Sequence, residues 1–266
     1  MGSTDAHLSA GSANEGMDDV EVEVLAEPEL VDSVLIEGLP GVGHVGTLVA
    51  EHLIEEGESE LLRRIYSEHL PPQVTVSESG LAELVCIECH HVVLGDRDLL
   101  VVTGDQQAGS GVGHYRIAEA VLDIAEEVGV ESVLALGGVP TGELVEDHAV
   151  LGAASSESLI ETLESSGVEF RENEPEGGIV GISGLLVGLG GRSGLDAACL
   201  MGETSGYLVD PKSAQAVLGV LEDLLEFEVD LTDLEERADE MEDVVERMQE
   251  IENQNMPTED DLRYIG

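Results

Sequence analysis

The stretch VDSVLIEGLPGVGHVGTLVAEHLI, residues 31–54, has the pattern of a β-strand, a tight turn and an α-helix. Its apolar run ends at Gly38, and residues 47–54 place apolar side chains at helical spacing. The turn contains the tetrapeptide GVGH, which occurs twice in the chain, at 41–44 and at 111–114, each time after an apolar run. The sequence therefore predicts two similar β-turn-α units.

Outward from this stretch, strand and helix patterns alternate along the chain. Strands are expected at 74–77, 84–94, 99–103, 132–136, 178–182 and 205–209, and helices at 115–128, 157–165, 195–201 and 211–225, with a glycine-rich loop at 184–194. Strands that alternate with helices favour an α/β fold in which helices flank a mostly parallel central sheet. We assign this core to residues 29–228.

The two ends of the chain differ from this core. Residues 1–28 are rich in Ser, Gly, Ala and acidic residues, and they predict a disordered acidic tail. Residues 229–256 predict an acidic C-terminal helix with a heptad pattern, and residues 257–266 a short C-terminal tail. The chain has no basic leader followed by an apolar segment, so we expect a cytoplasmic protein.

The helix expected at 229–256 carries a narrow apolar seam of the kind found in coiled coils. The seam consists of Leu231, Leu234, Ala238, Met241, Val245 and Met248. Thr232 and Glu235 have the spacing of a capping box at its start. A helix this acidic is not stable alone, so the seam either docks on the core or joins copies of the chain in a homo-oligomer.

The charge balance is extreme, with 58 acidic against 10 basic residues and a formal net charge of -48. The acids are spread over the whole chain, which is typical of an acidic, halophilic proteome. At molar salt the Debye length is about 3 Å, so self-repulsion is largely screened. The few arginines form no basic stripe, which excludes nucleic acid and anionic membranes as partners.

The glycine turns are the first candidate site. Gly41, Gly43 and Gly46 match the G-x-G-x-x-G spacing of a dinucleotide-binding turn, and Gly111 and Gly113 belong to the second tetrapeptide. No lysine follows either turn, so a Walker-type phosphate clamp is missing. We therefore interpret both as structural glycine turns and expect no cofactor.

Each tetrapeptide ends in a histidine, His44 or His114, at the start of a helix where a ligand could reach it. A histidine in such a place can act as a general base, but no nucleophile-elbow motif accompanies either one. We predict no catalytic residue. The alternative for these turns is a ligand crevice at the strand ends, shared by the two histidines.

The spacing of the cysteines matches sequence motifs of metal centres. Cys86, Cys89 and His90 match a zinc or haem-attachment motif, and Cys199 is a third thiol. Successive side chains of a strand alternate between faces, so Cys86 and Cys89 point to opposite sides. We therefore expect no metal.

Several motifs, in order along the chain, resemble a known family. They are LIEGLPGVGHVG at 35–46, RIY at 64–66, the proline pair at 71–72, LLVVTGD at 99–105 and GETSGYLVDPKSAQAVL at 202–218. Together they resemble the PAC2 family of proteasome assembly chaperones, in its archaeal form. The resemblance runs from about residue 30 to the C-terminus.

This resemblance implies a phosphorylase/hydrolase-like α/β core in a homo-oligomer that helps proteasome α-subunits assemble without catalysis. It also implies partner binding through a C-terminal hydrophobic-Tyr-X tail, which here comprises Leu262, Tyr264, Ile265 and Gly266. Tyr264 is third from the end rather than second, which departs from the family pattern.

The family has also been likened to ATP-grasp ligases, which gives the alternative function of a nucleotide-binding carboxylate-amine ligase. Such an enzyme would use the turn that contains Gly41, Gly43 and Gly46, together with the turn at 109–113. An ATP-grasp site needs basic residues on the phosphates, and these are almost absent near the turns. The sequence therefore favours the chaperone.

Overall fold

The computed structural model describes residues 19–28, 30–77, 79–145 and 147–255. Eight strands in this part of the chain form one mixed sheet, in the order β1-β3-β6-β7-β2-β8-β10-β9. They are β1 (Glu21–Val24), β2 (Val34–Glu37), β3 (Glu58–Tyr66), β6 (Ile87–Leu94), β7 (Arg97–Gly104), β8 (Ser132–Pro140), β9 (Val150–Ala154) and β10 (Asp196–Thr204). Two further strands, β4 (Val74–Val76) and β5 (Ala82–Leu84), form a separate hairpin.

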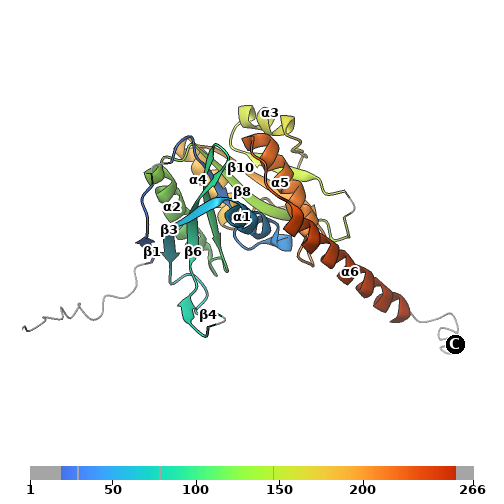
Figure 1. Ribbon diagram of the computed structural model, residues 1–266. Coiled ribbons are helices and arrows are strands. Elements are labelled where there is room, and N and C mark those ends of the chain that lie inside the picture. Colours follow the sequence, from blue (N-terminus) through green and yellow to red (C-terminus); the bar gives the residue numbers. More distant parts are fainter. Residues whose placement is uncertain (1–18, 29, 78, 146, 256–266) are drawn as a thin grey trace, which may run out of the picture.

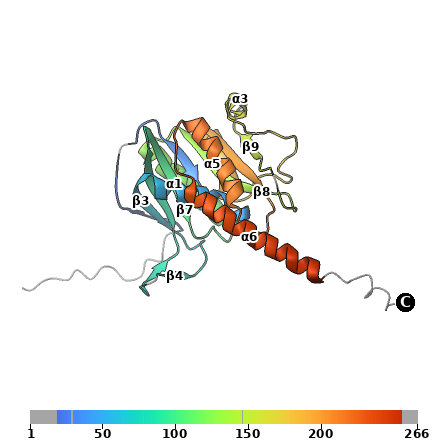
Figure 2. The same cartoon turned by 45° about the vertical axis from the view of Figure 1, so that its right-hand side comes forward.

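Helices cover both faces of the sheet (Figure 1, Figure 2). The helical segments are the 3-10 turn η1 (Val42–His44), α1 (Val45–Glu56), α2 (Gly111–Val128), α3 (Glu157–Ser165), α4 (Ile182–Ser193), α5 (Pro211–Leu225) and α6 (Thr232–Asn255). α1 and α5 pack on one face, and α2 and α4 on the other. None of the described helices combines the length and hydropathy that crossing a membrane requires.

The central strand β2 is buried on both faces. Leu35 and Ile36 are fully buried, although consecutive side chains of a strand point to opposite faces. Ile36 joins the core cluster under α1 and α5, and Leu35 joins the cluster under α2. Because a strand covered on both sides has a continuous apolar sequence, this strand was predicted directly from the sequence.

The prediction of a mostly parallel sheet is wrong. β2 pairs in parallel with β7 and β8, and β10 pairs in parallel with β8, but the four other pairings are antiparallel. One reason is local, because only Gly95 and Asp96 separate β6 from β7. A two-residue connection can join only antiparallel strands. The length of the connection, rather than the strand pattern, sets the direction.

The prediction for residues 178–209 is also wrong. Residues 178–182 are not a strand, 184–194 lie mainly in α4, 195–201 lie mainly in β10, and 205–209 form a loop. Leu and Ala favour a helix at 195–201 in isolation. Pairing with β8 and β9 and nearly complete burial override that propensity.

The glycines of α4 explain why this helix was predicted as a loop. A glycine inside a helix costs about 1 kcal/mol relative to alanine. A Cβ at Gly184 would lie 2.3 Å from the Ile179 carbonyl oxygen, and one at Gly191 would lie 2.7 Å from Ser155 Cβ. Close packing therefore requires glycine at positions that local propensity disfavours.

Three strands, β1, β3 and β9, were not predicted. Residues 21–24 form β1, which pairs with β3, so the predicted disordered tail 1–28 is wrong for these residues. Residues 1–18 lie outside the described part of the chain. The side chains of β1 are exposed, so no burial pattern marks this edge strand in the sequence.

The first turns of α6 dock on the core. Leu234 is fully buried in the same cluster as Val217 and Leu221 of α5. Arg237 Nη2 lies 3.8 Å from Glu55 Oε2 of α1. The rest of α6 extends away from the sheet in both views (Figure 1, Figure 2). The first part of the seam therefore docks on the core of its own chain. The side chain of Met248, the last residue of the seam, lies outside the described residues.

The capping box predicted from Thr232 and Glu235 is not the interaction that forms. The Asp230 carboxylate accepts hydrogen bonds from the Thr232 amide at 3.0 Å and from the Thr232 hydroxyl at 2.6 Å. The Asp230 carbonyl in turn accepts a hydrogen bond from His52 Nε2 of α1 at 2.8 Å. Asp230 therefore fixes both the start of α6 and its position on α1.

We expect Leu234→Ala to lower the free energy of unfolding by about 3 kcal/mol, because it leaves a cavity at a fully buried leucine. Met241→Ala, at a half-buried position of the same seam, serves as the control and should cost less than 1 kcal/mol. Chemical denaturation in molar salt measures both. Equal effects of the two substitutions would contradict docking of the first turns.

Candidate functional site

Both GVGH tetrapeptides lie where the parallel strands β2, β7, β8 and β10 end, which we call the carboxyl edge. Their conformations differ. The first forms η1, with Gly43 at φ 65° and His44 at φ 54°, whereas the second is the first turn of α2. Ser110 explains the difference, because its side chain accepts a hydrogen bond from the Gly113 amide at 3.1 Å and starts α2 there. The two β-turn-α units form as predicted, β2 with α1 and β7 with α2, but their turns are not similar.

The loop after β10 supports the first tetrapeptide. A Cβ at Gly43 would lie 2.8 Å from the hydroxyl oxygen of Thr204. The Asp210 amide donates a hydrogen bond to the Gly43 carbonyl at 2.9 Å, and the Asp210 carboxylate caps α5 by accepting from the Ser213 amide at 3.0 Å. The motif at 202–218 thus braces the turn at 41–44.

The other two glycines of the G-x-G-x-x-G motif, Gly41 and Gly46, differ in their roles. A Cβ at Gly46 would lie 2.6 Å from the Leu136 carbonyl oxygen, so glycine lets α1 approach β8. At Gly41 an added Cβ would meet only the Leu39 carbonyl oxygen, at 3.8 Å, and the backbone is extended. The backbone surroundings of Gly41 and Gly46 are therefore explained without a bound nucleotide.

The second tetrapeptide packs against the loop after β3. A Cβ at Gly113 would lie 2.4 Å from His69 Cβ, and the Gly109 amide donates to the His69 carbonyl at 2.9 Å. A Cβ at Gly111 would meet nothing within 4 Å. Close packing therefore requires glycine at position 113, whereas a Cβ at position 111 would clash with nothing.

His44 ends η1 and His114 lies in the first turn of α2, after the neighbouring strands β2 and β7. His44 is exposed and His114 is half-buried. A hollow of about 770 Å³ lies beside α1, β3 and β6, and neither histidine is among its lining residues. No interaction among the described residues joins the two rings, so the shared crevice stays a prediction.

That hollow is acidic. Its lining includes Glu51, Glu55 and Glu88. Its basic residues are His90 and Arg64, and Arg64 Nε donates to Glu88 Oε1 at 2.9 Å. The hydrogen bond from His90 is the main factor that lowers the pKa of Glu88. A nucleotide phosphate in this hollow would meet uncompensated carboxylates.

The cysteines do not share a metal-binding face. Cys86 lines the hollow on the α1 side, whereas Cys89 is buried in the cluster under α2. Burial raises the pKa of the Cys86 thiol to about 11 and that of Cys89 to about 12. Because Cys86 and Cys89 lie on opposite faces of the sheet, their sulfur atoms do not converge on one metal ion.

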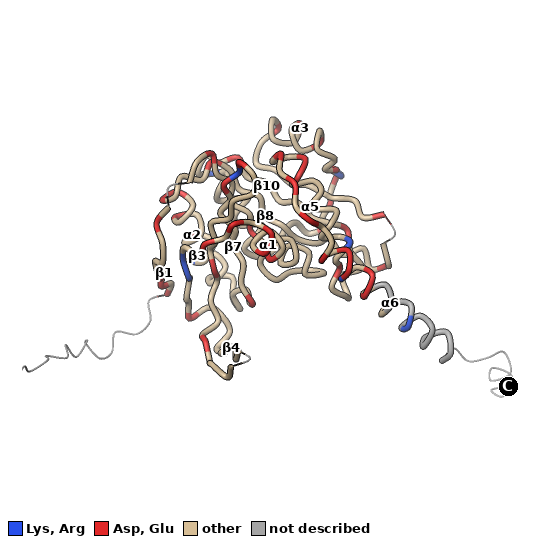
Figure 3. The backbone as a smooth tube through the Cα atoms, in the orientation of Figure 1, with Lys and Arg blue, Asp and Glu red and all other residues tan. Residues whose placement is uncertain are grey.

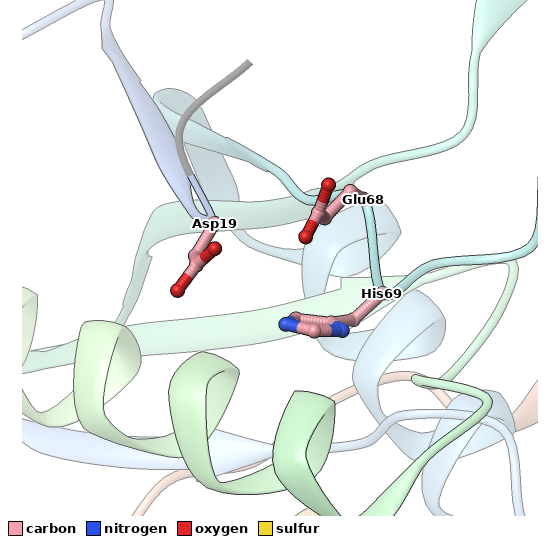
Figure 4. Close-up of side chains that lie close together, drawn as sticks. All are labelled: Asp19, Glu68 and His69. Atoms are coloured by element: carbon pink, nitrogen blue, oxygen red, sulfur yellow. The ribbon is translucent and has the colours of Figure 1, made fainter. Parts of the chain in front are cut away.

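Asp19, Glu68 and His69 bring their ligand-type atoms within 4.8 Å of one another, as Figure 4 shows. The two acids are exposed, and Asp19 Oδ2 also lies 3.8 Å from Arg116 Nε. Exposed carboxylates keep their water, and one of these faces an arginine. We therefore assign no metal to this cluster.

Glu37 is a buried acid at the carboxyl edge that sequence reasoning missed. Its Oε1 accepts a hydrogen bond from the Leu39 amide at 3.1 Å, whereas Oε2 has no protein partner among the described residues. Burial raises the pKa of Glu37 from 4.5 to about 7, partly opposed by a hydrogen bond from Ser183 of α4. The sequence feature that could have identified Glu37 is an acidic residue at the end of an apolar strand, just before Gly38.

We expect Glu37→Gln to stabilise the protein above pH 7. The raised pKa means that the stability contributed by the wild-type carboxyl is full below pH 4.5 and is lost as the pH rises to about 7. At 1.4 kcal/mol per pKa unit, the loss is on the order of 3 kcal/mol. Denaturation from pH 4 to 8 measures the difference between variant and wild type.

Glu88→Gln is the matched control for this titration. The pKa of Glu88 is lowered, so its contribution is present at neutral pH and is lost on acidification. The control should therefore lose stability at neutral pH, with a pH trend opposite to that of Glu37→Gln. A difference between Glu37→Gln and wild type that does not change with pH would rule out titration of Glu37.

The carboxyl edge also carries a surface without acids. It consists of residues 38–44, 106–115, 178–184 and 204–209, none of which is Asp or Glu, and we call it the acid-free edge. Asp105, Glu143 and Asp147 lie in loops of the same edge outside these ranges. Figure 3 shows acids over much of the rest of the chain and tan loops between the β4 hairpin and α6. The acid-free edge exposes Val42, Val112, Tyr115, Val180, Tyr207 and Val209. Exposed apolar residues gathered on one side are typical of interaction surfaces.

The residues expected to bind a partner through the tail, Leu262, Tyr264, Ile265 and Gly266, lie outside the described part of the chain. The structure therefore does not test them.

Comparison with known proteins adds a family match. Residues 35–249 match the model of the PAC2 family. The uncharacterized protein MJ1210 of Methanocaldococcus jannaschii is 40% identical over 244 residues, which are 89% of this chain and 93% of the relative.

Two solved structures from Pyrococcus furiosus are similar over most of their length. PbaB, described as an archaeal proteasome activator, has a TM-score of 0.82 and 38% identity, over 88% of this chain and 100% of that one. PbaA, described as an archaeal homolog of proteasome-assembly chaperone, has a TM-score of 0.73 and 28% identity, over 89% and 94%.

Proposed function

Because the chain belongs to the PAC2 family, we propose that it is a proteasome assembly chaperone-like protein that binds proteasome α-subunits or the α-ring without catalysis. The observation that carries this proposal is the family match over residues 35–249, together with the similarity to PbaA. The phosphorylase/hydrolase-like description of the sheet is a further part of the proposal that rests on the resemblance alone.

The geometry of the carboxyl edge supports binding rather than chemistry. Some backbone amides of the two turns are already used, because the His44 amide donates to the Gly41 carbonyl at 3.2 Å and the His114 amide to the Ser110 carbonyl at 3.0 Å. The Gly113 amide is bonded to the Ser110 side chain. What the edge offers to a partner is apolar surface.

The proposal includes a working environment and an assembly state. The net charge of -48 suits a halophilic cytoplasm, where molar salt screens the repulsion between acids. The chain acts as a homo-oligomer, which multiplies the number of contacts that it can make with a ring of proteasome subunits.

A second candidate function is activation of the assembled proteasome. The 38% identity and the TM-score of 0.82 with PbaB, described as a proteasome activator, favour this candidate. A chaperone binds free α-subunits before the ring closes, whereas an activator binds the finished particle and raises its peptidase activity. Measurement of both properties separates the two.

We expect removal of residues 257–266 to weaken capture of α-subunits, because this segment holds the proposed anchors Leu262, Tyr264, Ile265 and Gly266. Affinity purification in native salt measures the capture. Removal of residues 1–10 is the length-matched control and should leave capture unchanged, and both variants should melt like the full chain. Unchanged capture after removal of 257–266 would exclude the tail as the anchor.

We also expect calorimetry with ATP and magnesium in molar salt to give no heat of binding. The physical reason is the acidic field of a chain with a net charge of -48. A micromolar dissociation constant would instead support the carboxylate-amine ligase.

A further inference from the structure

We propose that the free edge of β1 binds an extended segment of a partner protein in which basic and apolar side chains alternate. The segment adds to the sheet as a further strand and places its apolar side chains in the groove between β1 and α2. The inference goes beyond the proposed function and does not depend on its proteasome part.

The two edges of the sheet differ. At one edge residue 169 covers β9, because the Gly152 amide donates to the Glu169 carbonyl at 2.9 Å and the Glu169 amide donates to the Val150 carbonyl at 2.8 Å. At the other edge β1 pairs with β3 on one side, and no strand in the described part of the chain pairs with its other side. An edge with unpaired backbone groups is a template for a further strand.

The backbone groups of Val22 and Val24 point away from β3. The Leu25 amide donates to the Leu62 carbonyl of β3 at 2.9 Å, so the backbone of Leu25 faces β3. Because alternate residues of an antiparallel strand bond to the partner strand, the amides and carbonyls of Val22 and Val24 face the outer side. A guest strand therefore finds two amides and two carbonyls on this edge.

A groove of about 840 Å³ lies between β1 and α2. Its apolar lining comes from both elements and comprises Val20, Val22, Val24, Ala120 and Ile124. Val22 is 38% exposed and Val24 is 54% exposed, so the β1 wall of the groove is open to a partner. Since the side chains of a strand alternate between faces, every second side chain of a guest strand enters the groove. Apolar side chains fit these positions.

The charges around the edge select basic residues at the other positions of the guest. On the face away from the groove, β1 carries the exposed side chains of Glu21 and Glu23. The α2 wall of the groove adds the exposed acids Glu119, Asp123 and Glu127. A lysine or arginine directly opposite a glutamate of β1 forms a stabilising cross-strand pair, whereas a like charge in that place destabilises the pairing.

The same charges disfavour a second copy of the chain as the guest. Pairing of β1 with β1 of another copy would place Glu21 and Glu23 against carboxylates of the same kind. Short, charged edge strands protect proteins against such pairing. Arg116 of the groove does not change this balance, because its guanidinium lies 3.5 Å from Glu119 Oε2 and 3.8 Å from Asp19 Oδ2. The edge therefore disfavours acidic strands and accepts basic ones.

The test is fluorescence anisotropy of a short labelled peptide of alternating lysine and valine, titrated with the full chain in molar potassium chloride. Molar salt screens the long-range attraction of a cationic peptide to the net charge of -48. This peptide should bind, and a peptide of alternating glutamate and valine should not. Absence of binding by the lysine–valine peptide, or equal affinity for the two peptides, overturns the proposal.

Two N-methylated forms of the lysine–valine peptide test backbone pairing on the unaltered protein. One form is methylated at every valine amide and the other at every lysine amide. Because only every second amide of a guest strand faces β1, one form should lose binding and the other should keep it. Equal binding by both forms, or loss of binding by both, contradicts pairing at a strand edge.

Val22→Pro removes one outward amide of β1 and should weaken binding of the lysine–valine peptide about fivefold or more. Proline is tolerated on an edge strand where its missing N–H faces solvent. Val22→Thr is the matched control, because it keeps the amide and the branched shape of the side chain, and it should bind nearly as well as the wild type. Equal affinities of the two variants count against the proposal. Circular dichroism melting checks folding, and where Val22→Pro does not fold the methylated peptides decide.

Glu21→Gln combined with Glu23→Gln tests the charge pairing and should also weaken binding of the lysine–valine peptide. Glu157→Gln combined with Glu161→Gln, at exposed positions of α3, makes the same change in net charge and should leave binding unchanged. Equal loss in the two double variants reduces the effect to net charge and overturns the proposal.

Two other occupants of the edge are distinguished by the same materials. A sedimentation coefficient of the protein alone that changes with Val22→Pro assigns the edge to a second copy of the chain. Tighter peptide binding after removal of residues 1–18 assigns it to the first segment of the chain itself. Either result overturns the proposal.

Discussion

The close crossing of α1 over the end of β2 and the middle of β8 is the constraint on which the rest of the carboxyl edge depends. A Cβ at Gly38 would lie 2.2 Å from the Gly46 carbonyl oxygen, and one at Gly46 would lie 2.6 Å from the Leu136 carbonyl oxygen. Backbone cannot move aside as a flexible side chain can, so both positions need glycine. The crossing fixes where α1 starts and therefore where η1 and the loop after β10 meet.

Electrostatics adds a second constraint, because water must reach almost every acid of so acidic a chain. Among the acids whose burial the structure describes, Glu37 is the exception, fully buried at the end of β2 near Ser183 of α4. Burial favours its protonated form near neutral pH, which removes the charge that would otherwise oppose packing of α4 on the sheet. The adjoining segments 38–44 and 178–184 contain no acid, whereas Asp105, Glu143 and Asp147 lie in other loops of the same edge.

The sequence correctly predicted those helices and strands whose apolar pattern reflects which of their faces is buried. Residues 157–165 and 211–225 are helices as predicted, because each has a polar N-cap and one apolar face. It did not predict β10 or α4, where neighbours override local propensity, or the antiparallel half of the sheet, which the two-residue connection at Gly95 and Asp96 determines. Of the site, it predicted glycine turns as structural but not Glu37, because a single buried acid has no periodic signature.

The fingerprint of Gly41, Gly43 and Gly46 shows why glycine spacing alone is a weak sign of nucleotide binding. A phosphate cradle needs glycines for close approach and also free backbone amides that point at the anion. Here the Gly38 amide donates to the Val102 carbonyl at 2.9 Å, and the His44 amide donates within the turn. Thr204 and Leu136 occupy the space beside the glycines. Gly43 and Gly46 therefore serve the packing of the protein on itself, whereas Gly41 meets no such neighbour.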